Sequence, residues 1–357
     1  MHEKYMELAI AEALMGAGKT FTNPLVGAVI VKNQQIISKG YHMNFGENHA
    51  EVNAILSCLS PKELINSTLY VTLEPCCHTG KQPPCTDLII NSGIKKIYIG
   101  QLDPNPLVSG MGVKKLTDNG IEVRTGILEK KVRHINEHYN TFFEKKRPFV
   151  TLKQSVSLDG KISLFQKRTA ITSEATNIFI KKERDKFQAI LVGSQTILTD
   201  NPILKASLNH QFQPTRVVLD RRGRLFETDK LKIFLDNESS VIIFTEKAEI
   251  WDIPNHVKVI KSEKITITFV LKELAKRQIQ SVYVEGGANI HDAFLESDQW
   301  DELISYIAPK LIGGDGISGF SSQRESKKLI TLENIKIKQL NEDLRVSIRR
   351  ISTCLQD

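Results

Sequence analysis

The sequence contains few cysteines and no long apolar run, and both deficits limit the kinds of protein it can be. Five of its 357 residues are cysteine, and Cys76, Cys77 and Cys85 lie close together. An odd, clustered set does not form the paired framework of a small secreted domain. No stretch approaches 18 uninterrupted apolar residues, and the amphipathic N-terminus lacks the apolar core of a signal peptide. We therefore expect a cytoplasmic protein without a membrane partner.

Two nucleotide-binding motifs are also missing. The run 16–20 ends like a P-loop, but Ala13 occupies the place of that motif's first glycine, and a helical pattern precedes the run instead of a strand. No G-x-G-x-x-G follows a predicted strand, so a Rossmann-type dinucleotide site is not indicated.

The length and charge favour a two-domain protein with an acidic ligand. A chain of 357 residues is typical of about two domains, and 41% hydrophobic and 25% charged residues are ordinary globular values. The net charge of +7 suits a phosphate ester or a nucleic acid, although a mildly basic surface alone would also account for it.

The first half contains a set of side chains typical of a zinc hydrolase. Catalytic zinc is commonly held by three protein ligands, and zinc deaminases with the signature H-x-E…P-C-x-x-C add a non-ligand glutamate that moves the proton. Here eight residues separate the two cysteines instead of two. We predict that His49, Cys76 and Cys85 bind zinc. Glu51 is the predicted catalytic residue, and Cys77 stays an alternative ligand to Cys76.

Hydrophobic periodicity predicts a three-layer α/β domain in the first half. Residues 52, 55, 56 and 59 form the buried stripe of a helix that begins at His49. The other predicted elements are a helix at 1–14, a hairpin of strands 25–31 and 35–41, a strand at 69–73, a helix at 86–91, and strands at 95–100 and 121–125.

The charged run 144–148 ends in proline and predicts a boundary between domains 1–145 and 146–357. A second α/β pattern follows, with strands at 149–154, 189–192, 215–219, 241–244, 257–260, 281–284, 301–308, 335–339 and 345–351, and helices from Ser173 and at 269–279 and 290–295.

Glu285-Gly286-Gly287 stands between a strand and a helix, a turn that exposes backbone N–H groups to a phosphate. Residues 313–316 form a second glycine-rich loop. From the residues alone, this half is a phosphate or nucleotide binder.

These motifs resemble those of one family, the bifunctional riboflavin-biosynthesis deaminase/reductases, over nearly the whole chain. The long cysteine spacing is that family's version of the deaminase signature. The resemblance rests on Asn23-Pro24-Leu25-Val26-Gly27, His49-Ala50-Glu51-Val52, Thr72-Leu73-Glu74-Pro75-Cys76, Pro83-Pro84-Cys85, Asp103-Pro104-Asn105-Pro106, Ser157-Leu158-Asp159-Gly160-Lys161, Ile171-Thr172-Ser173, Asp200-Asn201-Pro202 and Val284-Glu285-Gly286-Gly287.

The resemblance implies an N-terminal cytidine deaminase-like domain and a C-terminal dihydrofolate reductase-like domain. It implies zinc-dependent hydrolytic deamination of 2,5-diamino-6-ribosylamino-4(3H)-pyrimidinone 5′-phosphate. NADPH-dependent reduction of the ribosyl group then gives 5-amino-6-ribitylaminouracil 5′-phosphate. The expected partner is this small molecule and not nucleic acid, and the expected assembly is a homo-oligomer.

Carried over by position, the family's roles fall on residues in both halves. The family's Zn²⁺ ligands correspond to His49, Cys76 and Cys85. Its proton shuttle corresponds to Glu51, and its contact to the base corresponds to Asn23. NADP contacts fall on Gln154, Ala170, Thr196, Asp200 and the loop from Gly287. Substrate contacts fall on Arg168, Arg184, Leu204, Ser207 and Glu285.

Several positions depart from the family pattern. Ala170 stands where an aromatic residue is usual, and Cys77 where serine or asparagine is usual. Ser207 replaces an arginine that would hold a phosphate through two hydrogen bonds, which a lysine does not match. Lys205 or Arg168 could take over that contact.

Two other functions stay open on the sequence alone. A nucleic-acid or nucleoside base deaminase would need aromatic stacking groups, but aromatic residues are only 7% and the second half has no role in that function. A non-catalytic zinc- and nucleotide-binding regulator would have a closed site of four ligands, with Cys77 or His78 as the fourth.

Overall fold

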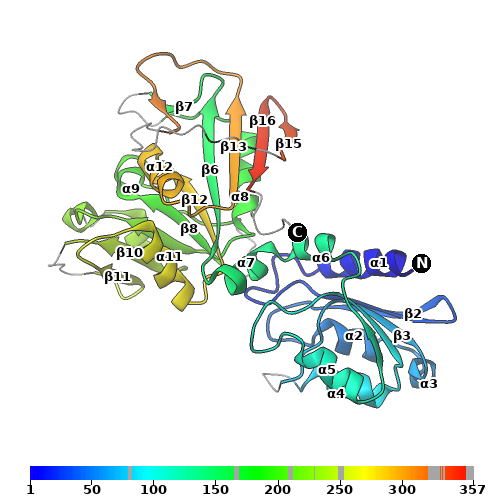
Figure 1. Cartoon of the computed structure of the whole chain (residues 1–357). Helices are drawn as coiled ribbons and strands as arrows, with labels where there is room; N and C mark the ends of the chain where they lie inside the picture. The colour runs from blue at the N-terminus through cyan, green and yellow to red at the C-terminus, as the bar shows by residue number, and fades with distance from the viewer. Residues whose placement is uncertain are drawn as a thin grey trace. The chain divides into compact units, whose positions relative to one another are not determined.

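The computed structural model describes residues 1–78, 83–164, 169–207, 212–228, 230–247, 253–320, 330, 332 and 334–350. The chain divides into two compact units, Met1–Lys146 and Arg147–Asp357, and the colours of Figure 1 follow the residue numbers through both. Each unit has its own β-sheet covered by helices. Within the described ranges no helix is long and apolar enough to cross a membrane.

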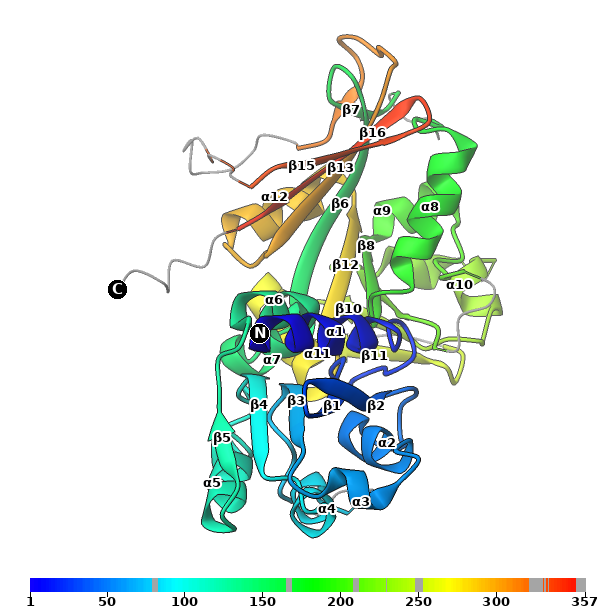
Figure 2. The ribbon, with the colours of Figure 1, turned by 90° about the vertical axis from the view of Figure 1, so that its right-hand side faces the viewer.

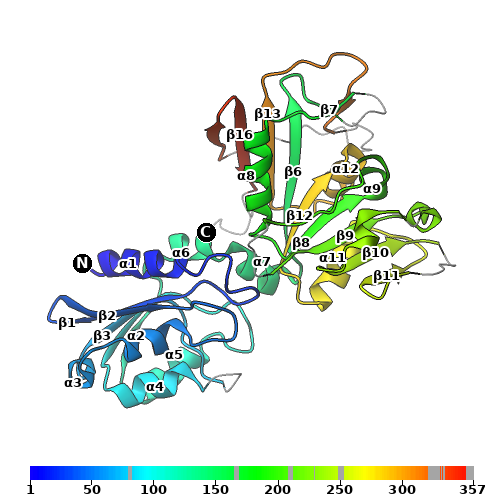
Figure 3. The ribbon, with the colours of Figure 1, turned by 180° about the vertical axis from the view of Figure 1, so that it is seen from behind.

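The first unit is a three-layer α/β domain (Figure 3). Its sheet has the order β2-β1-β3-β4-β5, with β1 antiparallel to both neighbours and β3, β4 and β5 parallel. The strands are β1 (Gly27–Lys32), β2 (Gln35–Tyr41), β3 (Thr68–Leu73), β4 (Lys96–Gln101) and β5 (Glu122–Arg124). The helices are α1 (His2–Leu14), α2 (Ala50–Leu56), α3 (Pro61–Leu64), α4 (Cys85–Ser92), α5 (Met111–Asp118), α6 (Glu129–Ile135) and α7 (Glu137–Lys145).

Alternate side chains of the central strands face two separate cores. Ala28 and Ile30 of β1 pack with α2 and α4 on one face of the sheet, whereas Val29 and Val31 pack with α1 on the other. Successive side chains of a strand point to opposite faces, so an apolar strand such as β1 supports helices on both sides.

Helix α2 buries only part of the predicted stripe. It ends at Leu56, and Leu56 and Leu59 are 67% and 101% exposed. The helix instead packs through Ala50, Ala54 and Ile55, because it lies so close to β2 that a Cβ on Gly40 would stand 2.3 Å from the Ala54 nitrogen. The predicted stripe is therefore confirmed at Ile55 and wrong at Leu56 and Leu59, since small residues make the close approach to β2.

The second unit contains a sheet in the order β11-β10-β9-β8-β12-β6-β13-β16-β15. From β11 to β13 in this spatial order, each strand is parallel to its neighbour. The last two strands, β16 and β15, are antiparallel additions at one edge of the sheet (Figure 2). The strands are β6 (Phe149–Ser157), β8 (Ala189–Gly193), β9 (Thr215–Leu219), β10 (Val241–Thr245), β11 (Val257–Lys261), β12 (Ser281–Gly286), β13 (Glu302–Ala308), β15 (Lys336–Leu340) and β16 (Asp343–Arg349), with a separate pair, β7 (Lys161–Ser163) and β14 (Ile317–Ser318).

Helices cover both faces of this sheet. Apolar residues of α11 and α12 belong to one core, and residues of α9 and α10 belong to another. The predicted cap of α8 is confirmed, since the Ser173 hydroxyl accepts a hydrogen bond from the Thr176 N–H. The helices are α8 (Glu174–Arg184), α9 (Ser194–Asp200), α10 (Lys232–Leu235), α11 (Ile267–Lys276) and α12 (Ala288–Glu296), with a 3-10 turn at Arg224–Glu227.

Candidate active sites

The predicted zinc residues of the first unit lie at the start of α2, at the start of α4 and in the loop after β3. His49 is the N-cap of α2, and Cys85 is the first residue of α4. Cys76 lies in the loop that follows β3. The ends of β3, α2 and α4 therefore meet where the sheet presents the carboxyl end of β3, the usual place for a ligand in an open α/β sheet.

The donor atoms of these three residues fit a zinc ion. The His49 Nδ1 atom lies 3.2 Å from the Cys85 sulfur and 3.5 Å from the Cys76 sulfur, and all three donors lie within 4.8 Å of one another. Tetrahedral zinc bonds nitrogen at about 2.0–2.1 Å and sulfur at about 2.3 Å, which puts neighbouring donors roughly 3.5 Å apart. Hydrogen bonds from Cys85 and His49 also lower the pKa of the Cys76 thiol, which favours the thiolate that binds metal.

Glu51 lies beside the cluster with its carboxyl group buried. The side chain is only 3% exposed. Burial, and then the neighbouring Cys76 charge, raise the pKa of Glu51 to about 7. A carboxyl group with such a pKa can both take and return a proton near neutral pH, and a cation bound to the adjacent residues would lower that pKa.

Cys77 stays outside the donor cluster among the described residues. The group that could hold a metal contains Cys76 and not Cys77. Burial raises the pKa of the Cys77 thiol, the opposite of the effect at Cys76.

Asn23, the predicted base contact, lies next to His42. The Asn23 Nδ2 atom is 3.1 Å from His42 Nε2, and His42 Nδ1 is 3.0 Å from the Asn48 carbonyl oxygen. The rings of His42 and His49 meet edge to face with centroids 5.7 Å apart. His42 directly follows β2, on the loop that leads to His49.

The second unit has a cleft of about 2030 Å³ along the carboxyl ends of its parallel strands. The cleft brings together every described residue predicted for the reductase half, and Arg168 lies outside the described residues. The predicted residues that line it are Gln154, Ala170, Arg184, Thr196, Asp200, Leu204, Ser207, Glu285 and Gly287.

A buried ion pair forms part of the cleft wall. Arg184 donates two hydrogen bonds to Glu285, from Nε at 2.6 Å and from Nη2 at 2.8 Å, and a third to the Lys205 carbonyl oxygen at 2.8 Å. Burial alone would raise the pKa of Glu285, but Arg184 and then Lys153 lower it to about 2. Such a bidentate pair fixes both planar groups in one orientation.

Lys153 of β6 also lines the cleft and was missed by the sequence prediction. Burial lowers the pKa of its ammonium group. Its ammonium nitrogen lies over the Tyr306 ring, 5.9 Å from the ring centroid. The signal in the sequence was that Lys153 is the one charged residue of the predicted strand 149–154.

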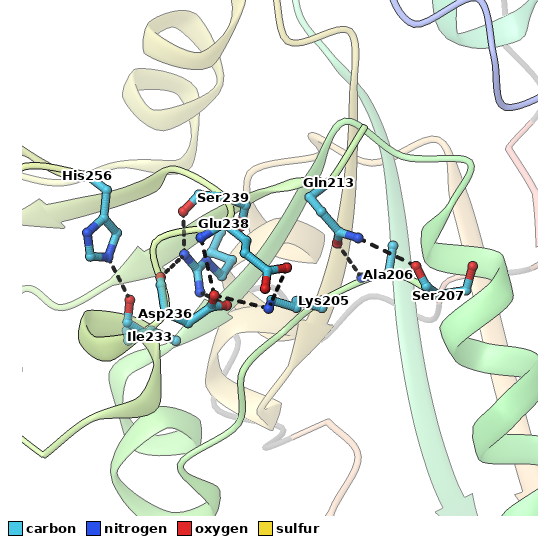
Figure 4. Close-up of polar contacts among 10 residues, drawn as sticks. Lys205, Ala206, Ser207, Gln213, Ile233, Asp236, Glu238, Ser239 and His256 are labelled. Carbon is cyan, nitrogen blue, oxygen red and sulfur yellow. Dashed lines mark hydrogen bonds and ion pairs between the residues drawn. The ribbon is translucent and has the colours of Figure 1, made fainter. Parts of the chain in front are cut away.

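Neither Lys205 nor Ser207 is free to hold a phosphate in place of the arginine that the family pattern has at position 207. Figure 4 shows the Lys205 ammonium between Asp236 and Glu238, at 3.0 and 2.8 Å. The Ser207 hydroxyl donates to Asp185 at 2.7 Å. Lys205 is therefore neutralised by two carboxylates, and the idea that it takes over the phosphate contact finds no support in this geometry.

The turn after β12 has the form that the glycines predicted. Gly286 has a φ of +94°, and a Cβ there would stand 2.8 Å from the His291 ring. Gly287 is the N-cap of α12, and both Gly287 and Ala288 line the cleft. The first N–H groups of a helix attract a phosphate, so this helix start suits a nucleotide. The second glycine-rich loop, 313–316, does not contribute to the lining of this cleft.

Comparisons with known proteins match both units. Residues 1–101 match the cytidine and deoxycytidylate deaminase zinc-binding region, and residues 148–346 match the RibD C-terminal domain. The riboflavin biosynthesis protein RibD of Bacillus amyloliquefaciens is 41% identical over 97% of this chain and 96% of its own length.

Solved structures give the same result over the full chain. The diaminohydroxyphosphoribosylaminopyrimidine deaminase/5-amino-6-(5-phosphoribosylamino)uracil reductase of Thermotoga maritima is similar at 39% identity and a TM-score of 0.88, with 98% of this chain and 99% of that chain covered. A structure of Acinetobacter baumannii RibD is similar at 32% identity, also with a TM-score of 0.88, covering 98% and 99%.

Fold and site together define an enzyme with a zinc-binding deaminase domain and a separate reductase domain. The cytidine deaminase-like and dihydrofolate reductase-like folds expected from the sequence are confirmed. The chain belongs to the RibD family of bifunctional riboflavin-biosynthesis deaminase/reductases.

Proposed function

We propose that the first unit deaminates 2,5-diamino-6-ribosylamino-4(3H)-pyrimidinone 5′-phosphate by hydrolysis. The observation that carries this proposal is the compact donor set of His49, Cys76 and Cys85 beside the buried carboxyl group of Glu51. The substrate class follows that of the Thermotoga maritima relative. The rival of a closed regulatory zinc site is disfavoured, because the donor set among the described residues has three members and not four.

Each residue of this site has a distinct role in the proposed reaction. Zinc held by three protein ligands supplies the nucleophile by making a water acidic near neutral pH. Glu51 accepts a proton from the attacking water and passes it to the ring nitrogen. It then moves the second proton of that water from the new hydroxyl group to the amino group, which leaves as ammonia. Asn23 holds an edge of the pyrimidine ring so that the amino-bearing carbon faces the zinc position.

The variant Glu51→Gln tests the proton transfer. It keeps the size of the side chain but cannot carry the proton, so ammonia release should fall by about 10²–10⁴-fold while zinc content is unchanged. Ammonia is measured with a coupled assay and zinc by metal analysis of the same sample. Glu63→Gln, at an exposed carboxylate that pairs with Lys32, is the control. Turnover of Glu51→Gln close to that of the unmodified chain would remove Glu51 from the mechanism.

We further propose that the second unit reduces the ribosyl group of the deaminated product with NADPH. The support is a large cleft at the carboxyl edge of a parallel sheet, with the start of α12 on its wall. The nicotinamide supplies the hydride. Because Glu285 offsets the charge of Arg184, Lys153 leaves this part of the cleft with a net positive charge when it is protonated, which suits the phosphate or an oxygen of the opened sugar.

Two further expectations stay predictions, a homo-oligomer and a cytoplasmic location. Light scattering of the full chain in solution measures the first directly.

A further inference from the structure

His42 has both ring nitrogens engaged, and their partners fix its tautomer. Nδ1 lies 3.0 Å from the Asn48 carbonyl oxygen. A carbonyl oxygen only accepts hydrogen bonds, so Nδ1 carries the proton. The ring is only 3% exposed, and the Asn23 amide nitrogen faces its Nε2 atom. A neutral ring protonated at Nδ1 has a bare lone pair at Nε2.

That lone pair determines how the Asn23 amide is turned. Nε2 lies 3.1 Å from Asn23 and can only accept, so Asn23 must present its NH₂ group. The Asn23 Oδ1 atom is then held on the opposite side of the amide. The side chain is half-buried, and Oδ1 has no hydrogen bond to another described residue. A fixed acceptor is therefore available beside the His42–His49 ring pair.

We propose that His42 is a positioning residue that fixes the Asn23 amide with Oδ1 toward the pyrimidine, so that the site selects rings presenting an N–H donor at that edge. The inference rests on the proposed deaminase function of the first unit. A diaminopyrimidinone offers ring N–H and amino donors. A ring with a lone pair at that edge would be repelled by the Asn23 Oδ1 atom. A site built to bond a substrate donor rejects analogues without it strongly, because its own polar group is then left unpaired.

The tautomer can be tested without any substrate. The zinc-loaded full chain is prepared with ¹⁵N-labelled histidine, and the ring nitrogens of His42 are observed by long-range ¹H–¹⁵N correlation. The signal is assigned by its loss in His42→Asn. We expect a protonated Nδ1 and an unprotonated Nε2. The opposite tautomer would overturn the inference, and this readout is independent of whether the proposed substrate is correct.

Two variants separate the two hydrogen bonds of His42. Glutamine can place an acceptor near the Nε2 position, and asparagine can place a donor near the Nδ1 position. His42→Asn should keep the bond to Asn48 but release Asn23, and the KM for the deaminase substrate should rise about tenfold with a smaller change in kcat. His42→Gln should keep the KM near that of the unmodified chain.

Zinc content and reductase activity of the same chain are the controls for both variants, since neither should change. Equal effects of the two variants on KM, or an unchanged KM in His42→Asn, would contradict the positioning role. If the unmodified chain released no ammonia from the proposed substrate, the proposed function would fail, and the nitrogen spectrum would still decide the tautomer.

Discussion

At the scale of single residues, two adjacent cysteines differ in what their thiols contact. The Cys76 sulfur lies 3.5 Å from His49 Nδ1, and it accepts from the Cys85 N–H at 3.4 Å. The Cys77 thiol makes neither contact, and the pKa shifts of the two thiols have opposite signs. A thiol whose pKa is lowered by such contacts forms the thiolate more readily and is the better zinc ligand.

The exchange of each cysteine for serine tests this choice. Cys76→Ser should lose most of its zinc and all measurable ammonia release, because a hydroxyl is a poor replacement for a thiolate ligand. Cys77→Ser should retain both. Metal analysis of the purified chains measures zinc directly. Loss of zinc in Cys77→Ser but not in Cys76→Ser would mean that the neighbouring residue is the ligand.

At the scale of elements, Glu74 connects the end of β3 to the start of α5. Its buried carboxylate accepts hydrogen bonds from the backbone N–H groups of Asp103, Gly110, Gly112 and Val113, at 2.9–3.2 Å. A Cβ on Gly112 would stand 2.2 Å from the Pro75 oxygen, so the two segments are in close contact. Glu74 thus fastens the loop that carries Cys76.

Glu74→Gln tests this connection. The amide accepts through one oxygen only, and its NH₂ group opposes two backbone donors, which costs about 1–3 kcal/mol in a buried place. Hydrogen exchange at Gly112 and Val113 should quicken by about tenfold, and zinc should bind more weakly. Asp87→Asn, at an exposed ion pair with Lys115, is the control. Unchanged exchange in Glu74→Gln would show that the carboxylate does not hold the loop.

A second connection holds the segment that carries Leu204 and Ser207. The fully buried Arg216 donates to the Asp236 carboxylate at 3.0 Å and to its carbonyl oxygen at 2.7 Å. The other oxygen of Asp236 pairs with Lys205 (Figure 4). The chain from Arg216 to Lys205 therefore links β9 to the wall of the cleft.

Arg216→Met should destabilise the second unit by about 1–3 kcal/mol, because the carbonyl oxygens of Asp236 and Ser239 lose their hydrogen-bond donor while the Asp236 carboxylate keeps Lys205. The thermal unfolding transition of the reductase unit, followed by loss of reductase activity after heating, reports this change. Arg221→Met removes an exposed pair with Glu246 and should cost at most about 1 kcal/mol. Equal shifts in the two variants would contradict the structural role of Arg216.

These contacts show what could and could not be predicted from the sequence. The zinc set and the Gly286-Gly287 turn depend on short motifs and on helix and strand ends, so the pattern was sufficient. The interactions of Glu74, and the burial of Arg216, arise between segments that only the tertiary fold brings together. Local periodicity also misjudged α2, because the packing partner, Gly40, lies in another element.

At the scale of the whole molecule, two different chemistries are assigned to two compact units of one chain. The zinc donors all lie in the first unit, and the large cleft lies wholly in the second. The net charge of +7 suits a phosphorylated substrate that is used by both units. Removal of zinc should therefore affect one reaction only.

The most direct test removes zinc from the full chain with a chelator and measures both reactions in the same sample. Ammonia release from the diaminopyrimidine phosphate should fall to background and return when zinc is added. NADPH oxidation with the deaminated pyrimidine phosphate should continue at the rate of the untreated chain. Ammonia release that persists without zinc, or reductase activity that falls in parallel with it, would contradict the account of two separate sites.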